Sequence, residues 1–387
     1  MLNFNKPKFV EASEAAIGRV ATDEQLLEKG TVENEISKVT AREWFALGNR
    51  VPYDRRAKEI LGLGETKDSP DVVHVFRRIM KDATPNEDAV WTSFLPGFPD
   101  GSFGWAKVDQ HLTGKSVGPR LFVEYVGQGD SDKPADYPYG TMERADLVEA
   151  LWEAEGIKST FIVGFDYSSL VALELLSRQQ DRRDRGTDPT TSIEGVLLIN
   201  GGLFADAHSH PWLTTPLLKT PMGKMGTWVA QRSKFAFNQM VKGSLWSKEY
   251  NVTSEELGEL YDAISRRNGA AFMSNGARFV DEHKANADRW DLRRVFFTSR
   301  ESVSFHILGS EGDPFEPNQI VKARERLGEY GVDIRVLPGG HLTTSEHPEL
   351  LAQIIREVGP NSDRLRAVRV LRATNSIGPG NGEGVLS

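Results

Sequence analysis

Short apolar runs recur between residues 89 and 337. Turns that are rich in glycine and polar residues follow them. Such continuous runs are typical of strands in a parallel sheet that is covered on both faces. The runs that we interpret as strands are residues 89–95, 120–126, 160–163, 195–199, 303–308 and 334–337. Amphipathic helical patterns lie between them, notably over residues 142–155 and 170–180. The alternation predicts an α/β protein with a doubly wound, mostly parallel sheet and right-handed crossovers.

One interval is too long for a single crossover. Residues 203–300 hold several helical patterns, among them 254–267, which begins at the sequence Thr253-Ser254-Glu255-Glu256. A structureless loop of that length would be unusual in a compact domain. We therefore predict an inserted helical cap over 203–300, with the α/β core formed by residues 41–202 and 301–359.

The two ends of the chain differ from this core pattern. Residues 1–40 are polar and compatible with helix, and we expect them to form an N-terminal extension packed on a domain. Residues 44–71 carry Gly, Pro and charges around short apolar groups, as edge strands and turns do. Residues 360–387 end in a glycine-rich stretch, and we expect a mobile C-terminal tail.

Composition narrows the class of protein. The chain has 387 residues, of which 39% are hydrophobic, including 19 Phe and 8 Trp, so it can bury a sizeable core. Its net charge is −8 and no long basic cluster is present, which argues against nucleic acid as a partner. The absence of cysteine excludes disulfides, thiolate metal sites and a cysteine nucleophile. The first residues lack the apolar region of a secretory signal, and no apolar stretch approaches the ~20 residues of a membrane helix. We expect a cytoplasmic protein that does not bind membranes; the sequence does not indicate its oligomeric state.

The most informative segment for chemistry is residues 162–170, where an apolar strand leads directly into a helix. A strand-to-helix turn this sharp needs small residues two positions before and two after its apex, because the backbones nearly touch there. Asp166 satisfies this rule, with Gly164 and Ser168 on either side, whereas Ser168 and Ser169 do not. The helix N-terminus also favours a carboxylate at this point. Asp166 is therefore a candidate nucleophile, although an ordinary helix N-cap has the same pattern.

Two later segments place further candidates at strand ends. Asp313 follows the predicted strand that ends at residue 308, and His341 follows the last strand after Gly339-Gly340. Ligand sites of open α/β sheets lie at the carboxyl ends of the strands, so these side chains are expected in one crevice. The chain order of nucleophile, acid and histidine is that of α/β-hydrolases.

These segments together resemble the α/β-hydrolase superfamily, specifically the aspartate-nucleophile branch that holds epoxide hydrolases and haloalkane dehalogenases. Residues 95–105 are similar to the family's oxyanion loop, and residues 125–134 resemble its Gly-x-Gly-x-Ser-Asp-Lys-Pro segment. Residues 166–204 look closest to the mesoderm-specific-transcript-like hydrolases. The resemblance covers about residues 44–359 and leaves both ends of the chain outside it.

The resemblance implies a cofactor-free hydrolase that acts on a small apolar substrate. Asp166 would attack an sp³ carbon and form a covalent alkyl ester. His341, oriented by Asp313, would activate the water that hydrolyses this ester. The backbone N–H groups of Phe98 and Tyr167 would form the oxyanion hole.

Departures from the family pattern decide between its branches. The usual His-Gly of the oxyanion loop is Pro96-Gly97 here. Dehalogenases typically bind the leaving halide with a Trp after the nucleophile and often an Asn in the oxyanion loop, but Tyr167 and Phe98 occupy those positions. The Gly-Phe-Pro order matches the epoxide-hydrolase version, whose Phe98–Pro99 bond is expected to be cis. We therefore expect epoxide-hydrolase-like chemistry, with haloalkane dehalogenation and a non-catalytic ligand-binding role as the alternatives.

Two further sets of residues are open to more than one interpretation. In epoxide hydrolases, tyrosines of the cap act as the acid; here the candidates are Tyr250 and Tyr261, and both are equally compatible with ordinary packing.

Residues 206–210, Asp-Ala-His-Ser-His, present metal-ligand types at alternate positions. No second ligand cluster accompanies them in the sequence, so we predict a polar hinge at the start of the cap and no metal site.

Overall fold

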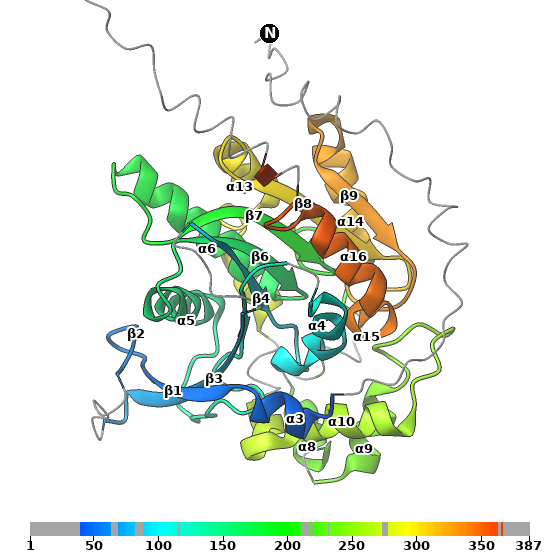
Figure 1. Ribbon diagram of the computed structural model, residues 1–387. Coiled ribbons are helices and arrows are strands. Elements are labelled where there is room, and N and C mark those ends of the chain that lie inside the picture. The colour runs from blue at the N-terminus through cyan, green and yellow to red at the C-terminus, as the bar shows by residue number, and fades with distance from the viewer. Residues whose placement is uncertain are drawn as a thin grey trace, which may run out of the picture.

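A nine-stranded sheet forms the centre of the molecule (Figure 1), as described by a computed structural model. The strand order is β2-β1-β3-β5-β4-β6-β7-β8-β9, in which β2, β1, β3 and β5 pair antiparallel and all other neighbours pair parallel. The predicted mostly parallel sheet is therefore confirmed. The structure describes residues 39–62, 69–81, 88–114, 117–210, 217, 220–230, 232–272, 278–362 and 365–366. The strands are β1 (Asn49–Asp54), β2 (Glu59–Ile60), β3 (Val72–Met80), β4 (Val90–Leu95), β5 (Arg120–Val123), β6 (Ser159–Phe165), β7 (Ser192–Ile199), β8 (Ser304–Ser310) and β9 (Asp333–Leu337).

The strands agree with the sequence prediction except at one place. All six predicted runs fall on strands β4 to β9, and the edge strands expected within residues 44–71 are β1 and β2. Strand β3 was not predicted, because its sequence Val-Val-His-Val-Phe-Arg-Arg-Ile-Met mixes charges with apolar residues instead of forming one apolar run. The strand accommodates its two arginines because both are paired: Arg78 forms an ion pair with Asp109, and Arg77 forms one with Glu155.

Helices cover both faces of the sheet, and side chains alternate between two hydrophobic clusters. On β6, Ile162 belongs to the cluster shared with α5 and α6, whereas its neighbours Phe161 and Val163 belong to the cluster shared with α4 and α16. This alternation is the doubly wound arrangement that the sequence predicts. The helices of the core are α3 (Ala41–Ala46), η1 (Gly101–Trp105), α4 (Ala106–Leu112), α5 (Thr141–Ala154), α6 (Ser168–Asp184), α14 (Pro317–Leu327), η3 (Gly328–Tyr330), α15 (Thr343–Glu346) and α16 (Pro348–Val358).

The segment between β7 and β8 contains several helices in its described residues, where the sequence predicts a cap, although residues 200–210 and 242–253 are not helical. Its helices are α8 (Pro221–Ala230), α9 (Lys234–Val241), α10 (Ser254–Ser265), η2 (Arg266–Phe272), α12 (Phe279–Ala285) and α13 (Leu292–Ser299). Helix α10 begins at the capping box of Thr253 and Glu256 and packs against α3, and α8, α9 and α10 gather beside α3 in Figure 1. Helix α13 instead packs against α6 of the core, so the last part of the segment belongs to the helical layer of the sheet.

The predictions for the two ends of the chain lie almost entirely outside the described residues. This applies to residues 1–38 of the expected extension and to residues 367–387 of the expected tail. Among the helices in the described parts of the chain, none is long and apolar enough to cross a membrane.

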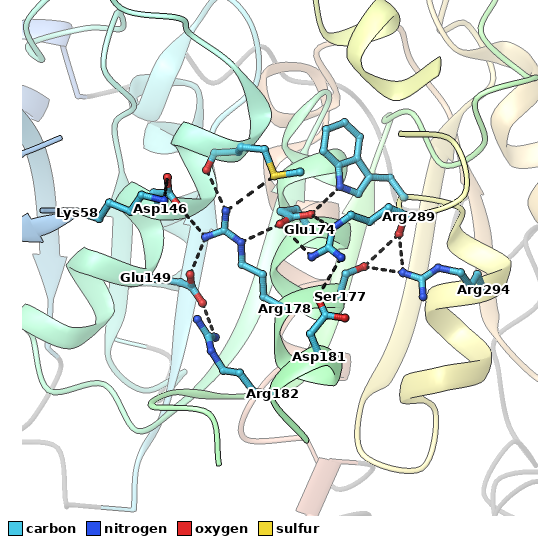
Figure 2. A network of polar contacts seen from close by, with 12 residues as sticks. Lys58, Asp146, Glu149, Glu174, Ser177, Arg178, Asp181, Arg182, Arg289 and Arg294 are labelled. Atoms are coloured by element: carbon cyan, nitrogen blue, oxygen red, sulfur yellow. Dashed lines mark hydrogen bonds and ion pairs between the residues drawn. The ribbon is translucent and has the colours of Figure 1, made fainter. Parts of the chain in front are cut away.

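A buried carboxylate on α6 connects three segments of the core (Figure 2). Glu174 accepts hydrogen bonds from Arg178 at 2.8 Å, from Arg289 at 2.7 Å and from the indole N–H of Trp290 at 2.8 Å. Arg178 also reaches Asp146 and Glu149 of α5, each at 2.7 Å. The network therefore joins α5, α6 and the residues that precede α13.

We expect Glu174→Ala to destabilise the fold strongly. The side chain is 2% exposed, and its removal leaves the Trp290 N–H facing a cavity without its acceptor and leaves Arg289 paired with Asp181 alone. Breaking a buried ion pair from one side costs about 3–5 kcal/mol. Because Arg178 keeps two other carboxylates, we expect the lower end of that range, about 3 kcal/mol, in urea unfolding. Glu153→Ala, which removes an exposed carboxylate of α5, is the control and should change the free energy of unfolding by less than about 0.5 kcal/mol.

Candidate active site

Asp166 lies at the apex of the turn between β6 and α6, where the sequence places it. Its backbone has φ of 55°, a left-handed conformation that is uncommon outside glycine. The turn is as tight as predicted: a Cβ atom on Gly164 would lie 3.2 Å from the carbonyl oxygen of Ser168. The Asp166 N–H donates to the carbonyl of Ile199 at 2.8 Å, and the Asp166 carbonyl accepts from Ser169 at 3.0 Å. These contacts fix a carboxylate in a strained position at the end of the sheet.

His341 and Asp313 lie beside this carboxylate. The Nδ1 atom of His341 is 3.1 Å from Asp313 Oδ1, and its Nε2 atom is 3.7 Å from Asp166 Oδ1. The three side chains are between 3% and 7% exposed. The structure thus brings together the three residues that the sequence picked from three different strand ends.

Asn200, at the end of β7, connects the loops that carry Asp313 and His341. Its side-chain N–H₂ donates to the carbonyl of His341 at 2.8 Å and to Ser310 Oγ at 2.9 Å. Its Oδ1 accepts from the Ser310 N–H at 2.8 Å. Sequence reasoning missed this residue, because its function depends on loops that follow more than 100 residues later.

The expected oxyanion loop is in contact with Asp166. The N–H of Phe98 donates to Asp166 Oδ2 at 2.9 Å, and the Tyr167 N–H is also hydrogen-bonded to this carboxylate. The Phe98–Pro99 bond is cis, as the resemblance predicts. Gln128 holds the loop by donating to the carbonyl of Gly97 at 2.7 Å.

The charges of Asp166 and His341 depend on each other. Burial raises the pKa of Asp166, and the nearby His341 together with the two backbone N–H groups offsets part of that rise. Burial alone would lower the pKa of His341, but Asp313, Asp166 and Asp100 outweigh it and raise the pKa to about 9. The imidazolium form therefore predominates at neutral pH while Asp166 is ionised.

Asp100, which sequence reasoning missed, is a third buried carboxyl group beside Asp166 and Asp313. It is 4% exposed, its Oδ1 has no hydrogen-bond partner among the described residues, and it lines a small cavity together with Trp246 and Leu342. Burial raises its pKa to about 7, and the charge of Asp166 adds to the rise. Asp100 therefore exists largely as a mixture of acid and carboxylate near pH 7. The available signal was its position directly after the Phe98-Pro99 pair.

The two cap tyrosines occupy other surroundings. The Tyr250 hydroxyl donates to Glu256 at 2.5 Å and accepts from Lys107 at 3.2 Å, while burial and the Glu256 carboxylate raise its pKa. Tyr261 packs its ring 5.5 Å from that of Phe237. None of these contacts involves Asp166 or His341, and an acid role for either tyrosine stays a prediction from the resemblance.

A cluster of possible metal ligands lies nearby, at the start of the cap. The imidazoles of His208 and His210 both approach Glu316, which sequence reasoning did not connect with them. Asp206, in contrast, points to Lys322 and Arg326. The expectation that residues 206–210 lack a second set of ligands was therefore wrong for the two histidines.

Comparison with known proteins places these residues in a family context. The model of the family described as "Alpha/beta hydrolase family" matches residues 94–354. The mesoderm-specific transcript homolog protein of Bos taurus is 29% identical over 226 residues, which is 58% of this chain and 64% of that protein. The mesoderm-specific transcript protein of Mus musculus is 28% identical with the same coverage. The chain thus spans less than two thirds of the length of these curated relatives.

Solved structures show the same fold at lower identity. A loop variant of the haloalkane dehalogenase from Bradyrhizobium elkanii has a TM-score of 0.56 and 20% identity, covering 78% of this chain and 96% of its own. A thermophilic esterase from Thermogutta terrifontis has a TM-score of 0.53 and 17% identity, covering 83% and 99%. At these identities the likeness is evidence for the fold alone, since one fold hosts many chemistries.

The coupling between the two charges is testable by titration. We expect Asp166→Asn to lower the pKa of His341 from about 9, because a neutral amide no longer stabilises the imidazolium. The measurement is an NMR titration of ¹⁵N-labelled imidazole signals. Asp206→Asn, a change to an exposed carboxylate, should leave the His341 titration unchanged. Identical His341 titrations in wild type and Asp166→Asn would contradict the coupling.

Proposed function

Since this chain belongs to the alpha/beta hydrolase family, we propose that it hydrolyses a small apolar substrate through a covalent ester on Asp166, with epoxide opening as the reaction. Asp166 is the nucleophile, His341 the base and Asp313 the acid that orients it. The N–H groups of Phe98 and Tyr167 form the oxyanion hole. No cofactor takes part in these steps.

The observation that carries this proposal is the position of a carboxylate, and not a hydroxyl, at the apex of the turn. Asp166 Oδ2 is bonded to the Phe98 N–H, which leaves Oδ1 on the side of His341, 3.7 Å from its Nε2. A carboxylate oxygen can displace a leaving group from an sp³ carbon and leave an ester that water can cleave. The arrangement supports attack by Oδ1, with Oδ2 already in the oxyanion hole.

Epoxide hydrolysis at this site would take two steps, ester formation and ester hydrolysis. Oδ1 forms a bond to one ring carbon, the C–O bond of that carbon breaks, and the released oxygen takes up a proton. Water then adds to Cγ of the ester while His341 Nε2 accepts its proton, and Oδ2 carries the negative charge within the oxyanion hole. Collapse of this intermediate breaks the Cγ–Oδ1 bond, and Oδ1 leaves with the product and takes the proton from His341. The new carboxyl group of Asp166 releases the second proton of the water, which replaces the one given to the epoxide oxygen, so epoxide and water give a diol.

Ester formation also changes the base. The carboxylate of Asp166 is one cause of the raised pKa of His341, and the alkyl ester carries no charge. Loss of that charge lowers the pKa of His341 and favours the neutral imidazole that the second step needs. The Asp166 carboxylate thus disfavours the neutral, basic form of His341 before attack. Its conversion to an ester favours that form afterwards.

We assign the proton donor for the epoxide oxygen to Asp100 instead of a cap tyrosine. Its carboxyl group is buried beside the triad, its Oδ1 lacks a partner among the described residues, and its pKa of about 7 keeps a protonated fraction at neutral pH. A pKa near the working pH is the condition for efficient acid catalysis. Tyr250, whose hydroxyl already donates to Glu256, would have to break that bond first.

Haloalkane dehalogenation uses the same nucleophile but needs donors for the departing halide. The two positions that supply these donors in the resemblance are Phe98 and Tyr167, and phenylalanine has no side-chain donor. The Tyr167 hydroxyl is buried and without a partner within the described part of the chain, so it is a side-chain donor that could favour this second candidate. A ligand-binding protein without turnover is the remaining alternative.

Trapping of the ester is the direct test. We expect His341→Gln to lower steady-state turnover by about 10²–10⁴-fold, because the ester still forms but no base activates water. Intact-mass analysis after incubation with an epoxide panel should then show a gain of one whole epoxide per chain, mapped to Asp166. A gain of one alkyl group from a haloalkane, with halide released, would instead establish dehalogenation.

The matched control is the double variant Asp166→Asn, His341→Gln, in which neither substrate class should leave an adduct. An adduct that persists in this variant would show alkylation of another side chain. If single-variant protein that is folded by circular dichroism gains no mass with any member of either panel, the carbon-attack proposal is wrong for these substrates.

The role of Asp100 predicts a difference between substrates. In the His341→Gln background, Asp100→Asn should slow ester formation from epoxides by about 10²–10⁴-fold, since the amide cannot supply the proton. Attack on a haloalkane, which needs no proton, should change far less. Glu124→Gln is the control, because Glu124 is also buried with a pKa raised to about 8, yet it is bonded to Ser102. Equal slowing by both variants would indicate a structural effect.

A further inference from the structure

Three of the eight histidines of this chain converge at one point of the fold. His208 and His210 lie on the segment that leads from β7 into the cap, and His283 lies on α12. His208 and His210 contact Glu316, the residue directly before α14, and His283 contacts His208. Zinc prefers cysteine sulfur and histidine nitrogen as ligands. Since the chain has no cysteine, histidine is the residue type that can supply such a ligand here.

The ligand atoms of this cluster are close together and buried. His208 Nδ1 is 2.6 Å and His210 Nε2 is 2.7 Å from the same oxygen, Glu316 Oε1. The side chains of His208, His210 and Glu316 are 2%, 5% and 1% exposed. One nitrogen from each imidazole and one carboxylate oxygen therefore face a common point, shielded from water.

Residues around the cluster hold these side chains in place. Gln319 donates to Glu316 Oε2 at 3.0 Å and accepts the N–H groups of Leu203 and Phe204 at 3.0 and 2.9 Å. His283 Nδ1 lies 2.8 Å from His208 Nε2. When His208 Nε2–H donates to His283, the Nδ1 atom of His208 presents a lone pair toward Glu316, the second-sphere contact typical of histidine ligands.

The backbone leaves room for this arrangement. A Cβ atom on Gly202 would lie 2.6 Å from His208 Cε1 and 3.4 Å from His283 Nδ1. Any other residue at position 202 would therefore displace the His208 imidazole.

We propose that His208, His210 and Glu316 form a binding site for a divalent transition-metal ion of the zinc class. Two imidazoles and one carboxylate are a ligand set that Zn²⁺ takes in proteins, with a fourth position left for water or a further ligand. At Zn–N and Zn–O distances of about 2.0–2.1 Å and tetrahedral angles, neighbouring ligand atoms lie about 3.3 Å apart. The present nitrogen–oxygen distances must therefore lengthen by about 0.6–0.7 Å, which small side-chain rotations provide.

The site uses other residues than the proposed catalytic ones, although the two are neighbours. Phe315 contacts both, with its ring centroid 4.8 Å from that of His341 and 5.9 Å from that of His210, and the charge of His210 lowers the pKa of Asp166. A metal ion here joins the entry segment of the cap to the first turn of α14 in the core. Its consequence is to fix the cap on the sheet, and this inference does not depend on the reaction at Asp166.

The test is zinc binding by the full chain after treatment with chelator, followed by isothermal titration with Zn²⁺. We expect one equivalent to bind and to raise Tm, because the ion binds only the folded arrangement. We expect His210→Ala and Glu316→Gln each to weaken binding by more than about 100-fold, and His283→Gln by about 10–100-fold. Co²⁺ used in place of Zn²⁺ should give the visible absorption of a four-coordinate site, which Glu316→Gln abolishes.

Two controls separate this site from others. His306→Gln removes a buried imidazole 2.9 Å from the Asp333 carboxylate, a similar pair outside the cluster, and should keep zinc affinity unchanged. His341→Ala tests whether the ion binds the triad instead. Absence of zinc binding by wild type, or binding that Glu316→Gln retains and His341→Ala loses, would overturn the proposal.

Discussion

The structure around the candidate site is governed by the burial of one carboxylate at a sharp turn. Asp166 is 5% exposed, and burial of its charge is unfavourable unless hydrogen bonds and an opposite charge compensate. Two backbone N–H groups and the imidazole of His341 supply that compensation. Each of these donors comes from a different part of the chain, so the tertiary fold must form before the charge becomes tolerable. A site of this kind exists only at the meeting point of several strand ends.

The sheet provides this meeting point. Strands β4, β6 and β7 pair in parallel, and β8 pairs next to β7, so their carboxyl ends lie side by side. The oxyanion loop follows β4, Asp166 follows β6, and Asn200 follows β7. Asn200 then bonds to the loops after β8 and β9, which carry Asp313 and His341. One amide side chain thus links the end of β8, three residues before Asp313, to the backbone of His341.

Sequence reasoning located those features whose signal is local. Asp166 could be identified because the steric rule for the turn involves only Gly164 and Ser168, which are two residues away. Asp313 and His341 could be placed because the carboxyl ends of parallel strands lie along the same edge of the sheet. Asp100, Glu316 and His283 were missed because their importance arises from burial and from partners far away in sequence: 75 residues separate His283 from His208, and 108 separate Glu316 from it. The surroundings of Tyr250 could not be read from the sequence for the same reason, since Glu256 and Lys107 bind its hydroxyl only in the folded protein.

The short segment between β8 and α14 gives the two buried clusters a common support. Asp313, which lies 3.1 Å from His341 Nδ1, and Glu316, which contacts His208 and His210, are three residues apart, and Asp313 Oδ1 also accepts the N–H of Phe315 at 2.9 Å. Pro317 then begins the helix with a fixed backbone angle. A displacement of this short segment therefore moves the acid of the triad and the carboxylate of the histidine cluster together. His208 and His210 hold the start of the cap segment against Glu316. The same contacts therefore help to keep Asp313 in place beside His341.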